Sequence, residues 1–458
     1  MSADLREFYS ALKSWADEAV AHFRMSSDAV WAVDADEDWQ YAGADTYCVQ
    51  PRTDTRWSFA GLDRVRQLDS YARARAAGGH CPPVAAVLDK LVGSALGKSR
   101  VDFWRLAASV LPAPEELDDY GPTFFDRRFE HLASSLEASQ VHFHSIHFLD
   151  GLVLDGGVIE LAPGLTLERA TPEEVIRGLK LGMLRPEFPM VSTSTFNLAE
   201  RQASVIKRRW TLPRVVFDPI SDEREPHRDL PEWDEREKEG RAVLDAIAVL
   251  TGRRVSVVGF VTFKDPAATS LLDDGWSPLR VYPSVVGVSD VKGSPELTQN
   301  LRRTYTMIRH PAFARNKALA LAVRRLGLAA HRDLAEDRLL DVFIAAEAFY
   351  LSDADNLELS YRLALRAALW GTDGALDWSR QQIFDHMKRG YGLRSKYAHG
   401  TEPKPKDLRL QDRQVSLAEF VAVTEEIVRS AVLKAMRVME QSNGQLTIDW
   451  EALVLPDC

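Results

Sequence analysis

Residues 338–350 read RLLDVFIAAEAFY, a run that is apolar around nearly the whole circumference of a helix. A helix of this kind is stable in water only when other helices surround it, so the run predicts the centre of a helical bundle. Further helical patterns on both sides extend the predicted bundle over residues 296–445. Two pairs with the spacing of a capping box mark helix starts inside it: Asp355 with Glu358, and Ser416 with Glu419.

The rest of the chain divides into a helical region, a strand-rich region and a tail. Residues 1–138 show repeated helical patterns, at residues 2–24, 61–76, 83–96, 99–110 and 123–138. Residues 139–295 change to short β-like runs between turn signals, with one helix opened by Thr171 and Pro172. The charged segment 221–239 reads as a solvated loop or a helix start. With a tail at 446–458, the predicted fold class is α+β: a helical N-terminal region, a β-rich middle domain and a C-terminal all-α bundle.

Composition excludes several classes of protein. The chain has 458 residues, 45% of them hydrophobic, which is enough to bury real cores and excludes disorder. Its 57 basic and 67 acidic residues give a net charge of −10, which excludes a protein that coats nucleic acid nonspecifically. The three widely spaced cysteines favour a reducing compartment. Because no signal-peptide pattern and no membrane-length apolar run is found, we expect a cytoplasmic protein without a membrane partner.

Two motifs suggest other chemistry. The stretch LVGSALGKS (91–99) ends like a phosphate-binding loop, but Val92 stands where that loop needs a glycine, and a helical pattern precedes it. We interpret this stretch as a helix break. His142, His144 and His147 have a spacing that suits metal ligands on a strand. Since no second metal-type cluster accompanies them, we favour ordinary sheet histidines, predict no metal site, and keep a metal-dependent hydrolase as a third hypothesis.

The stretch GYGLRSKYAHG (390–400) carries the most informative pair of residues. Arg394 and His399 lie five positions apart, and Gly400 follows as a natural helix C-cap. RNA cleavage by attack of the 2′-OH requires proton transfer and stabilisation of extra negative charge on the phosphorane. Histidine titrates near neutral pH and can transfer protons, while the guanidinium of arginine fits phosphate oxygens. The pair therefore predicts a site for metal-independent RNA cleavage.

The two residues do not share a face of one regular helix, because positions i and i+5 are about 140° apart. Either the helix is irregular, which Gly390 and Gly392 would permit, or the site is composite. A twofold dimer would bring two arginines and two histidines to one groove, and we favour that arrangement.

Basic residues surround the pair. Between Lys388 and Arg409 the sequence has seven basic and two acidic residues, a local net charge of +5 within an acidic chain. Complementing a helix C-terminus explains two or three of these cations but not the whole stretch. Five of them are expected to bind RNA: Lys388, Arg389, Lys396, Lys404 and Lys406.

Glu347 lies inside the apolar run, where a carboxylate needs a cationic or hydrogen-bonding partner. Arg362 and Arg366 lie on the charged stripe of the next helix, and Arg394 is a third candidate. Glu347 and Arg362 are therefore predicted to support the catalytic pair, with a purely structural ion pair as an equal alternative. Ser395 either orients the site or bonds to the backbone.

Three ordered segments, DRLLDVFIAAEAF, ELSYRLALRAALWG and YGLRSKYAHG, resemble the ApeA-like branch of the HEPN proteins. The hallmark of that family is R-x(4–6)-H, which Arg394 and His399 match with four residues between them. The resemblance covers roughly the last third of the chain. It implies a helical HEPN bundle that forms a homodimer, with Arg394 and His399 as catalytic residues of a metal-independent endoribonuclease and Ser395 at the polar position after the arginine.

The first functional hypothesis is therefore an effector that cleaves tRNA or other cellular RNA, in the antiphage abortive-infection or toxin systems in which such family members act. The N-terminal regions would then sense a phage-derived trigger or hold the site inactive. The alternative is a noncatalytic HEPN module that binds RNA, nucleotides or a partner protein as a sensor or scaffold. No cofactor is predicted for either function.

Overall fold

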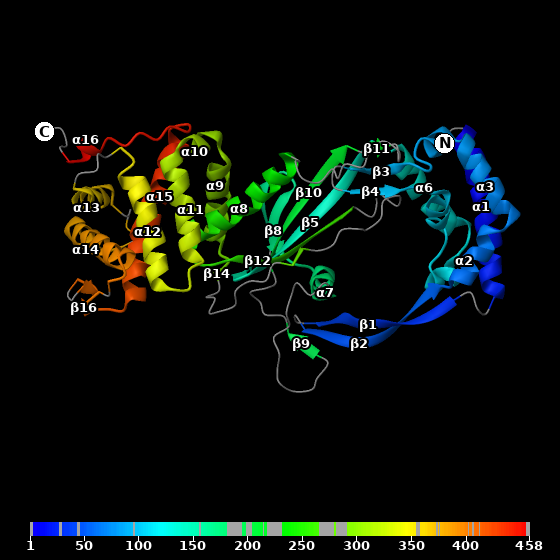
Figure 1. Ribbon diagram of the computed structural model, residues 1–458, viewed down its shortest axis with the longest axis horizontal. Coiled ribbons are helices and arrows are strands. Elements are labelled where there is room, and N and C mark those ends of the chain that lie inside the picture. Colours follow the sequence, from blue (N-terminus) through cyan, green and yellow to red (C-terminus); the bar gives the residue numbers. More distant parts are fainter. Residues whose placement is uncertain are drawn as a thin grey trace.

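The computed structural model describes most of the chain between Ala3 and Val454. The described ranges are 3–26, 30–43, 46–94, 97–154, 157–180, 195–197, 204–213, 215–217, 231–264, 279–280, 291–353, 358–371, 374, 376–401, 403–404, 407–411 and 413–454. The molecule is elongated, with a group of helices at each end and a β-sheet between them (Figure 1).

A helical unit forms the N-terminal end of the molecule. Its helices are α1 (Ala3–Met25), α2 (Phe59–Arg66), α3 (Asp69–His80), α4 (Pro82–Ala85), α5 (Phe103–Ala108), η1 (Pro114–Asp119) and α6 (Pro122–Glu137). The apolar stripe of α1 is buried, as the sequence predicts, with Phe8 and Trp15 fully covered. The rings of Phe103 and Phe129 lie against Phe8 and join α5 and α6 to the same core.

Two β-hairpins correct the expectation that residues 1–138 are helical throughout. β1 (Val30–Gly43) and β2 (Thr46–Trp57) pair antiparallel, and β9 (Thr195–Asn197) extends them. β3 (Leu91–Ser94) and β4 (Gly97–Arg100) form the second hairpin, which pairs with β11 (Val215–Phe217). The predicted helix over 83–96 is wrong beyond its first turn, and the expected helix break at 91–99 is this hairpin. The partner strand β11 lies more than a hundred residues away, so local periodicity could not reveal the pairing.

A six-stranded antiparallel sheet forms the centre, as predicted for the middle region. Its order is β13-β12-β5-β10-β8-β7, and its strands are β5 (Gln140–Asp150), β7 (Val158–Ala162), β8 (Leu165–Arg169), β10 (Ser204–Pro213), β12 (Ser256–Lys264) and β13 (Leu279–Arg280). Beside it, β6 (Leu152–Val153) pairs parallel with β14 (Val291–Lys292).

Helices cover both faces of the central sheet. Val205 and Ile206 follow each other on β10 and therefore point to opposite faces. Val205 packs in one core with Val175 of α7 (Pro172–Lys180), and Ile206 packs in another with Val243 of α8 (Pro231–Thr251). The Thr171 hydroxyl accepts a hydrogen bond from the Glu174 N–H, which confirms the predicted helix start.

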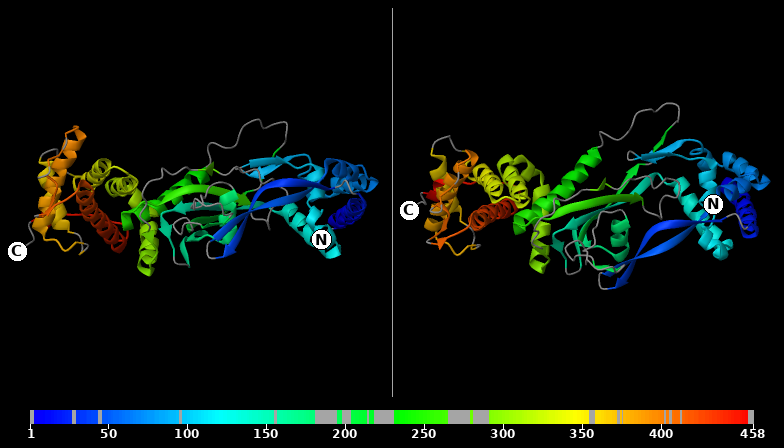
Figure 2. Two further views of the ribbon diagram at one scale, coloured as in Figure 1. Left: turned by 90° about the horizontal axis from the view of Figure 1, so that it is seen from below. Right: turned by 60° about the horizontal axis from the view of Figure 1, so that its bottom comes forward.

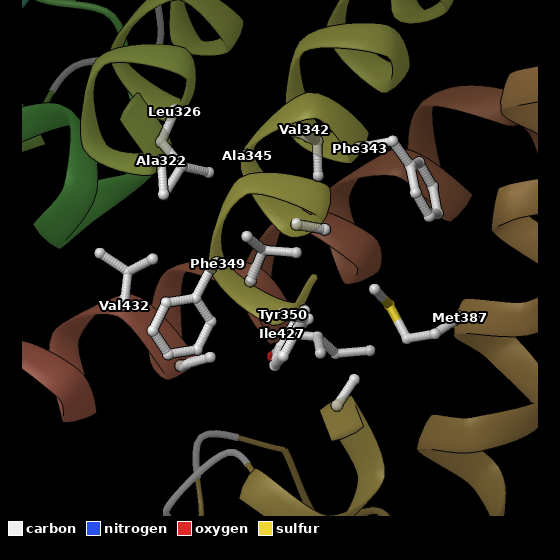
Figure 3. Close-up of a cluster of buried hydrophobic side chains, with 14 of the residues drawn as sticks. Ala322, Leu326, Val342, Phe343, Ala345, Phe349, Tyr350, Met387, Ile427 and Val432 are labelled. Atoms are coloured by element: carbon white, nitrogen blue, oxygen red, sulfur yellow. The ribbon is translucent and has the colours of Figure 1, made fainter. Parts of the chain in front are cut away.

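The C-terminal bundle lies at the other end of the molecule. Its helices are α9 (Pro295–Arg309), α10 (Pro311–Arg315), α11 (Lys317–Ala330), α12 (Ala335–Tyr350), α13 (Leu359–Trp370), α14 (Arg380–Ala398), α15 (Leu417–Gln441) and α16 (Trp450–Val454). Figure 3 shows side chains of α12, among them Val342 and Phe349, packed against Ile427 and Val432 of α15. The apolar run at 338–350 is thus the buried centre of a helical bundle, as the sequence predicts.

The two expected capping boxes have different outcomes. Ser416 and Glu419 form a complete capping box at the start of α15. Glu358 is itself the N-cap of α13, with a left-handed backbone (φ 51°) and no side-chain cap. It therefore precedes the helix instead of lying in its first turn, and that expectation is wrong; Asp355 lies outside the described residues.

Buried polar contacts join the bundle to the central domain. The sequence predicts at most a helix start within 221–239, and the structure has the whole helix α8 at Pro231–Thr251. This helix ends against the bundle. There Arg338 of α12 donates to the Gly252 carbonyl at 2.8 Å, and Arg429 of α15 donates to the Val249 carbonyl at 3.2 Å. Arg338 also donates to the buried carboxylate of Glu425 at 2.7 Å. These contacts satisfy the last carbonyls of α8 and fix its end on the bundle.

Among the described helices, none is both long and apolar enough to cross a membrane.

Candidate active site at the end of helix α14

Helix α14 has well-defined caps at both ends. Ser379 and Gln382 form a capping box at its start. At its end, Gly400 has φ +69° and donates its N–H to the Tyr397 carbonyl, and the Thr401 N–H reaches the Lys396 carbonyl at 2.8 Å. This is a Schellman motif, so the predicted C-cap at Gly400 is confirmed. His399 is the C-cap residue of α14 and lies inside this motif. Its backbone is therefore held in one conformation.

Gly390 and Gly392 do not interrupt the helix. Helix α14 is continuous through both, so the irregular helix allowed by the sequence is not what the structure has. Gly390 is needed for another reason: a Cβ atom there would lie 2.6 Å from Cζ of Phe343, closer than packed side chains approach. The glycine permits α14 to pack tightly on α12.

Gly392 has no comparable reason to be glycine. A Cβ atom on it would meet no atom within 4 Å, and the residue is exposed. Glycine inside a helix is less favourable than alanine by about 1 kcal/mol. Within one chain, nothing described around Gly392 compensates for that loss.

The outer face of α14 carries His399. Asp385, Lys388, Gly392 and His399 are exposed, and Ser395 is half-buried. At about 100° per residue, these five positions fall on one side of the helix. Figure 2 shows α14 at the end of the molecule farthest from the N-terminal unit in both views.

Arg394 lies on a different side of α14, facing α12. Its Nη2 atom is 3.3 Å from Oε2 of Glu347, and the two side chains are 29% and 26% exposed. Arg394 is thus the cationic partner that the position of Glu347 required. Arg366, the other arginine proposed for that role, bonds Asp353 and the Tyr350 carbonyl instead.

Arg362, the expected supporting residue, lies near Asp353. The charge of Arg362 acts on the Asp353 carboxyl, whose pKa is lowered by the hydrogen bond and charge of Arg366 and by Arg362, against the opposing effect of burial. The reason is helical spacing: Arg362 and Arg366 are four residues apart, so both reach the same side of α13.

Tyr391 belongs to this cluster and was not predicted from the sequence. Its hydroxyl lies near the Glu347 carboxylate, and its pKa is raised, first by burial and then by the Glu347 charge. Its ring lies edge-on to Phe343 at 6.1 Å, and the Arg394 guanidinium lies 5.9 Å from the ring centre. The available signal was spacing, since Tyr391 precedes Arg394 by three residues on one helix.

The guanidinium of Arg394 is only partly satisfied by these contacts. Its Nε atom is buried and has no hydrogen-bond partner among the described atoms, and the bond from Nη2 to Glu347 is long for a charged pair. Glu347 and Tyr391 therefore orient Arg394 without saturating its donors.

The predicted RNA-binding residues have mixed surroundings. Lys396 is 2.5 Å from Asp407, whose carboxylate also accepts the Lys404 N–H at 2.8 Å. Arg389 donates to the Arg409 carbonyl, which fixes the segment after the motif against α14. Lys388 is exposed, with its ammonium 5.6 Å from the Phe384 ring. Lys406 lies outside the described residues.

One chain therefore does not bring the catalytic candidates onto one face. Arg394 and His399 lie near the same helix end but about 140° apart around it, with Ser395 between them. Because α14 is a regular helix, the first of the two anticipated arrangements, an irregular helix, is wrong, and the composite site stays a prediction.

The two other motifs do not form sites in the described structure. Lys98 and Ser99 lie on strand β4 and not at the strand-to-helix turn that cradles phosphate. His142 is exposed, whereas burial lowers the pKa of His147 to about 4, and its ring stacks on Phe260. Among the described residues, no three His, Cys, Asp or Glu side chains are grouped as metal ligands.

Comparison with known proteins adds no relative to this picture. No protein-family model, no curated protein and no solved structure matches the chain.

Proposed function

We propose that this protein is a metal-independent endoribonuclease that acts as a homodimer through its C-terminal bundle, with Arg394 and His399 as catalytic residues. The observation that carries the proposal is the arrangement at the end of α14. An exposed histidine on a rigid Schellman cap lies one helical turn beyond an arginine that Glu347 and Tyr391 orient.

The chemistry of these groups suits cleavage by internal attack. One histidine removes the proton from the 2′-OH while its oxygen attacks the phosphorus, and a second histidine donates a proton to the departing 5′-oxygen. The arginines stabilise the negative charge on the phosphorane. The products are a 2′,3′-cyclic phosphate and a 5′-hydroxyl, so neither water nor a metal ion is consumed.

The proposal includes membership of the ApeA-like branch of the HEPN proteins and a role in antiphage or toxin-type growth arrest, in the cytoplasm. The three ordered sequence segments support it. They lie on α12, on α13 and at the end of α14, three neighbouring helices of one bundle.

The test compares wild-type protein with His399→Ala and Arg394→Ala on RNA in EDTA. Because acid–base catalysis contributes about 10²–10⁴-fold, each variant should lose at least a hundredfold in rate. His131→Ala, at an exposed histidine of α6, is the matched control and should retain full activity. Equal cleavage by wild type and His399→Ala would refute the proposal.

A noncatalytic RNA-binding module is the second candidate. It is favoured by the separation of Arg394 and His399 around α14 within one chain, which leaves a cationic surface without an assembled pair. It predicts salt-dependent RNA binding, weakened when Lys404 and Lys406 are neutralised, with no cleavage products at any protein concentration.

A further inference from the structure

We propose that a cavity on the central sheet, beside α7, binds a small zwitterionic molecule of di- or tripeptide size, with its ammonium group at Glu160 and its carboxylate at Arg209. This inference assigns a second site, in the central domain, and goes beyond the nuclease function proposed above.

The cavity has the size of a ligand site. Its volume is about 440 Å³, and small-molecule sites in proteins measure roughly 300–1,000 Å³. Residues of strands β5, β7, β8 and β10 line it, together with Glu174 in the first turn of α7. Figure 1 shows β5, β8 and β10 side by side, with α7 below them in that view. The cavity therefore lies outside the helical bundle that carries His399.

The strand register places the polar lining residues on one face of the sheet. Glu160 of β7 pairs with Thr166 of β8, which in turn pairs with Lys207 of β10. Arg209 follows Lys207 by two positions on β10, so both side chains point to the same face. Val205, two positions before Lys207, packs against α7 on that face. The four polar side chains therefore lie over one surface beside α7.

The lysine in this row already has partners. The Lys207 ammonium is 3.2 Å from Glu168 and 2.7 Å from Glu174, and the three side chains are only 18–23% exposed. Thr166 donates to Glu168 at 3.1 Å, and Glu174 accepts the Thr171 N–H at 2.8 Å at the start of α7. Because its two carboxylate partners are themselves held in place, Lys207 belongs to the wall of the cavity.

The two remaining charges of this face have no partner. Glu160 and Arg209 are exposed, and neither makes a hydrogen bond or ion pair through its side chain with another described residue. A guanidinium binds a carboxylate through two parallel hydrogen bonds, and a carboxylate binds an ammonium group. The cavity therefore offers one place for an anion and one for a cation.

The distance between the two charges selects the size of the ligand. Two strand spacings and two residues along β10 separate the Cα atoms of Glu160 and Arg209 by about 12 Å. A free amino acid carries both charges within one residue, about 3.6 Å of extended chain, whereas an extended tripeptide spans about 11 Å. Ile146 and Val158 give the cavity apolar walls, and Val158 is 61% exposed without a ligand.

The backbone around Arg209 is fixed. Its N–H donates to the Gly164 carbonyl at 2.8 Å, and the neighbouring Arg208 donates to the Pro163 carbonyl at 2.5 Å. Gly164 has φ +72°, and a Cβ atom there would lie 3.0 Å from the Arg209 carbonyl oxygen. The turn between β7 and β8 is thus held on β10. Because Glu160 and Arg209 lie on strands joined in this way, little order has to be gained on binding.

Calorimetric titration of the full chain with trialanine tests the inference, because the methyl side chains of this peptide make few demands on the cavity. The N-acetylated and the C-amidated peptides should each bind at least tenfold more weakly than trialanine, since each lacks one charge. No binding of trialanine at millimolar concentrations, or equal binding of the blocked peptides, would overturn the inference.

Variants assign each end of the ligand. Glu160→Gln should weaken trialanine binding at least tenfold and leave N-acetylation without further effect, and Arg209→Gln should do the same for C-amidation. Glu130→Gln on α6 and Arg73→Gln on α3 change exposed residues far from the cavity and should bind all three peptides like the wild type. If Glu160→Gln still distinguishes the acetylated peptide, the ammonium group does not lie at Glu160.

Ligand length is the last readout. Free alanine should bind at least tenfold more weakly than trialanine, because it cannot reach both charges. Equal affinities would contradict the spacing argument. These titrations contain no RNA, so their result stands whether or not the chain proves to be a ribonuclease.

Discussion

Gly390 and Phe343 lie so close that a Cβ atom on the glycine would come within 2.6 Å of the Phe343 ring. Phe343 is fully buried, and its ring also packs near Tyr391, so it has little space to move. The contact sets the distance between α12 and α14, and thereby the distance between Glu347 and Arg394.

Gly390→Ala should therefore destabilise the protein although alanine favours helices. Overpacking of a tight core site costs about 1–3 kcal/mol, which exceeds the helical gain of about 1 kcal/mol. Gly392→Ala, two residues away in open space, should instead raise the free energy of unfolding by about 0.5–1 kcal/mol in dilute protein. Urea unfolding of both variants measures the difference, and the same sign for both would contradict this view of α14.

Tyr391→Phe should impair cleavage while leaving RNA binding nearly unchanged. The substitution keeps the ring and removes the hydroxyl that lies near the Glu347 carboxylate, so Arg394 loses part of its orientation. We expect the cleavage rate to fall about tenfold, which corresponds to ~1.4 kcal/mol in the barrier. Tyr361→Phe, at an exposed tyrosine of α13, is the control. Equal rates for the two variants would show that Tyr391 acts only in packing.

Arg338→Met should be strongly destabilising, because it removes the hydrogen-bonded cation from the buried Glu425 carboxylate. Burial raises the pKa of Glu425, and the charges of Arg338 and Arg429 offset only part of that rise. Removing one partner of a buried pair costs about 3–5 kcal/mol, and the double variant Arg338→Met/Glu425→Gln should recover part of that loss. Arg303→Met breaks the exposed pair with Glu440 and should cost less than about 1 kcal/mol. Thermal unfolding of the three variants is the measurement.

His386 should make the stability of the protein depend on pH. Its ring is buried, Nε2 is 2.9 Å from the Thr424 hydroxyl, and Nδ1 has no partner among the described atoms. Burial, with a smaller effect of the Arg389 charge, lowers its pKa to about 3. Between these two pKa values, His386 is protonated in the unfolded chain and neutral in the folded chain. Its contribution to the free energy of unfolding is therefore fully present above about pH 6.5 and is lost as the pH falls below that value.

The size of this effect can be isolated with His386→Gln. Between pH 6.5 and 5 the wild type should lose about 1.6 kcal/mol more of its unfolding free energy than the variant, because the slope approaches its full value of about 1.4 kcal/mol per pH unit only below pH 6. Other acidic groups titrate equally in both proteins and cancel in the difference. Parallel stability curves for the two proteins would mean that His386 is accessible to protons in the folded state.

The sequence by itself determined the elements whose cause is local. The buried helix at 338–350, the Ser416 capping box and the Gly400 cap each depend on residues within a few positions, and each is confirmed. The need of Glu347 for a cationic partner also followed from burial of a charge in an apolar run. The hairpins β1–β2 and β3–β4 were missed because cross-strand hydrogen bonds, and not helical periodicity, stabilise those residues.

Only the tertiary structure decided which partners meet. It paired Glu347 with Arg394 and Arg366 with Asp353, added Tyr391 and Asp407 to the candidate site, and showed that Gly390 fits a contact while Gly392 fits none among the described residues. These outcomes depend on the distance and rotation between helices that are far apart in the sequence. Local patterns fix which face of a helix is apolar, but side-chain packing across the whole bundle fixes what that face meets.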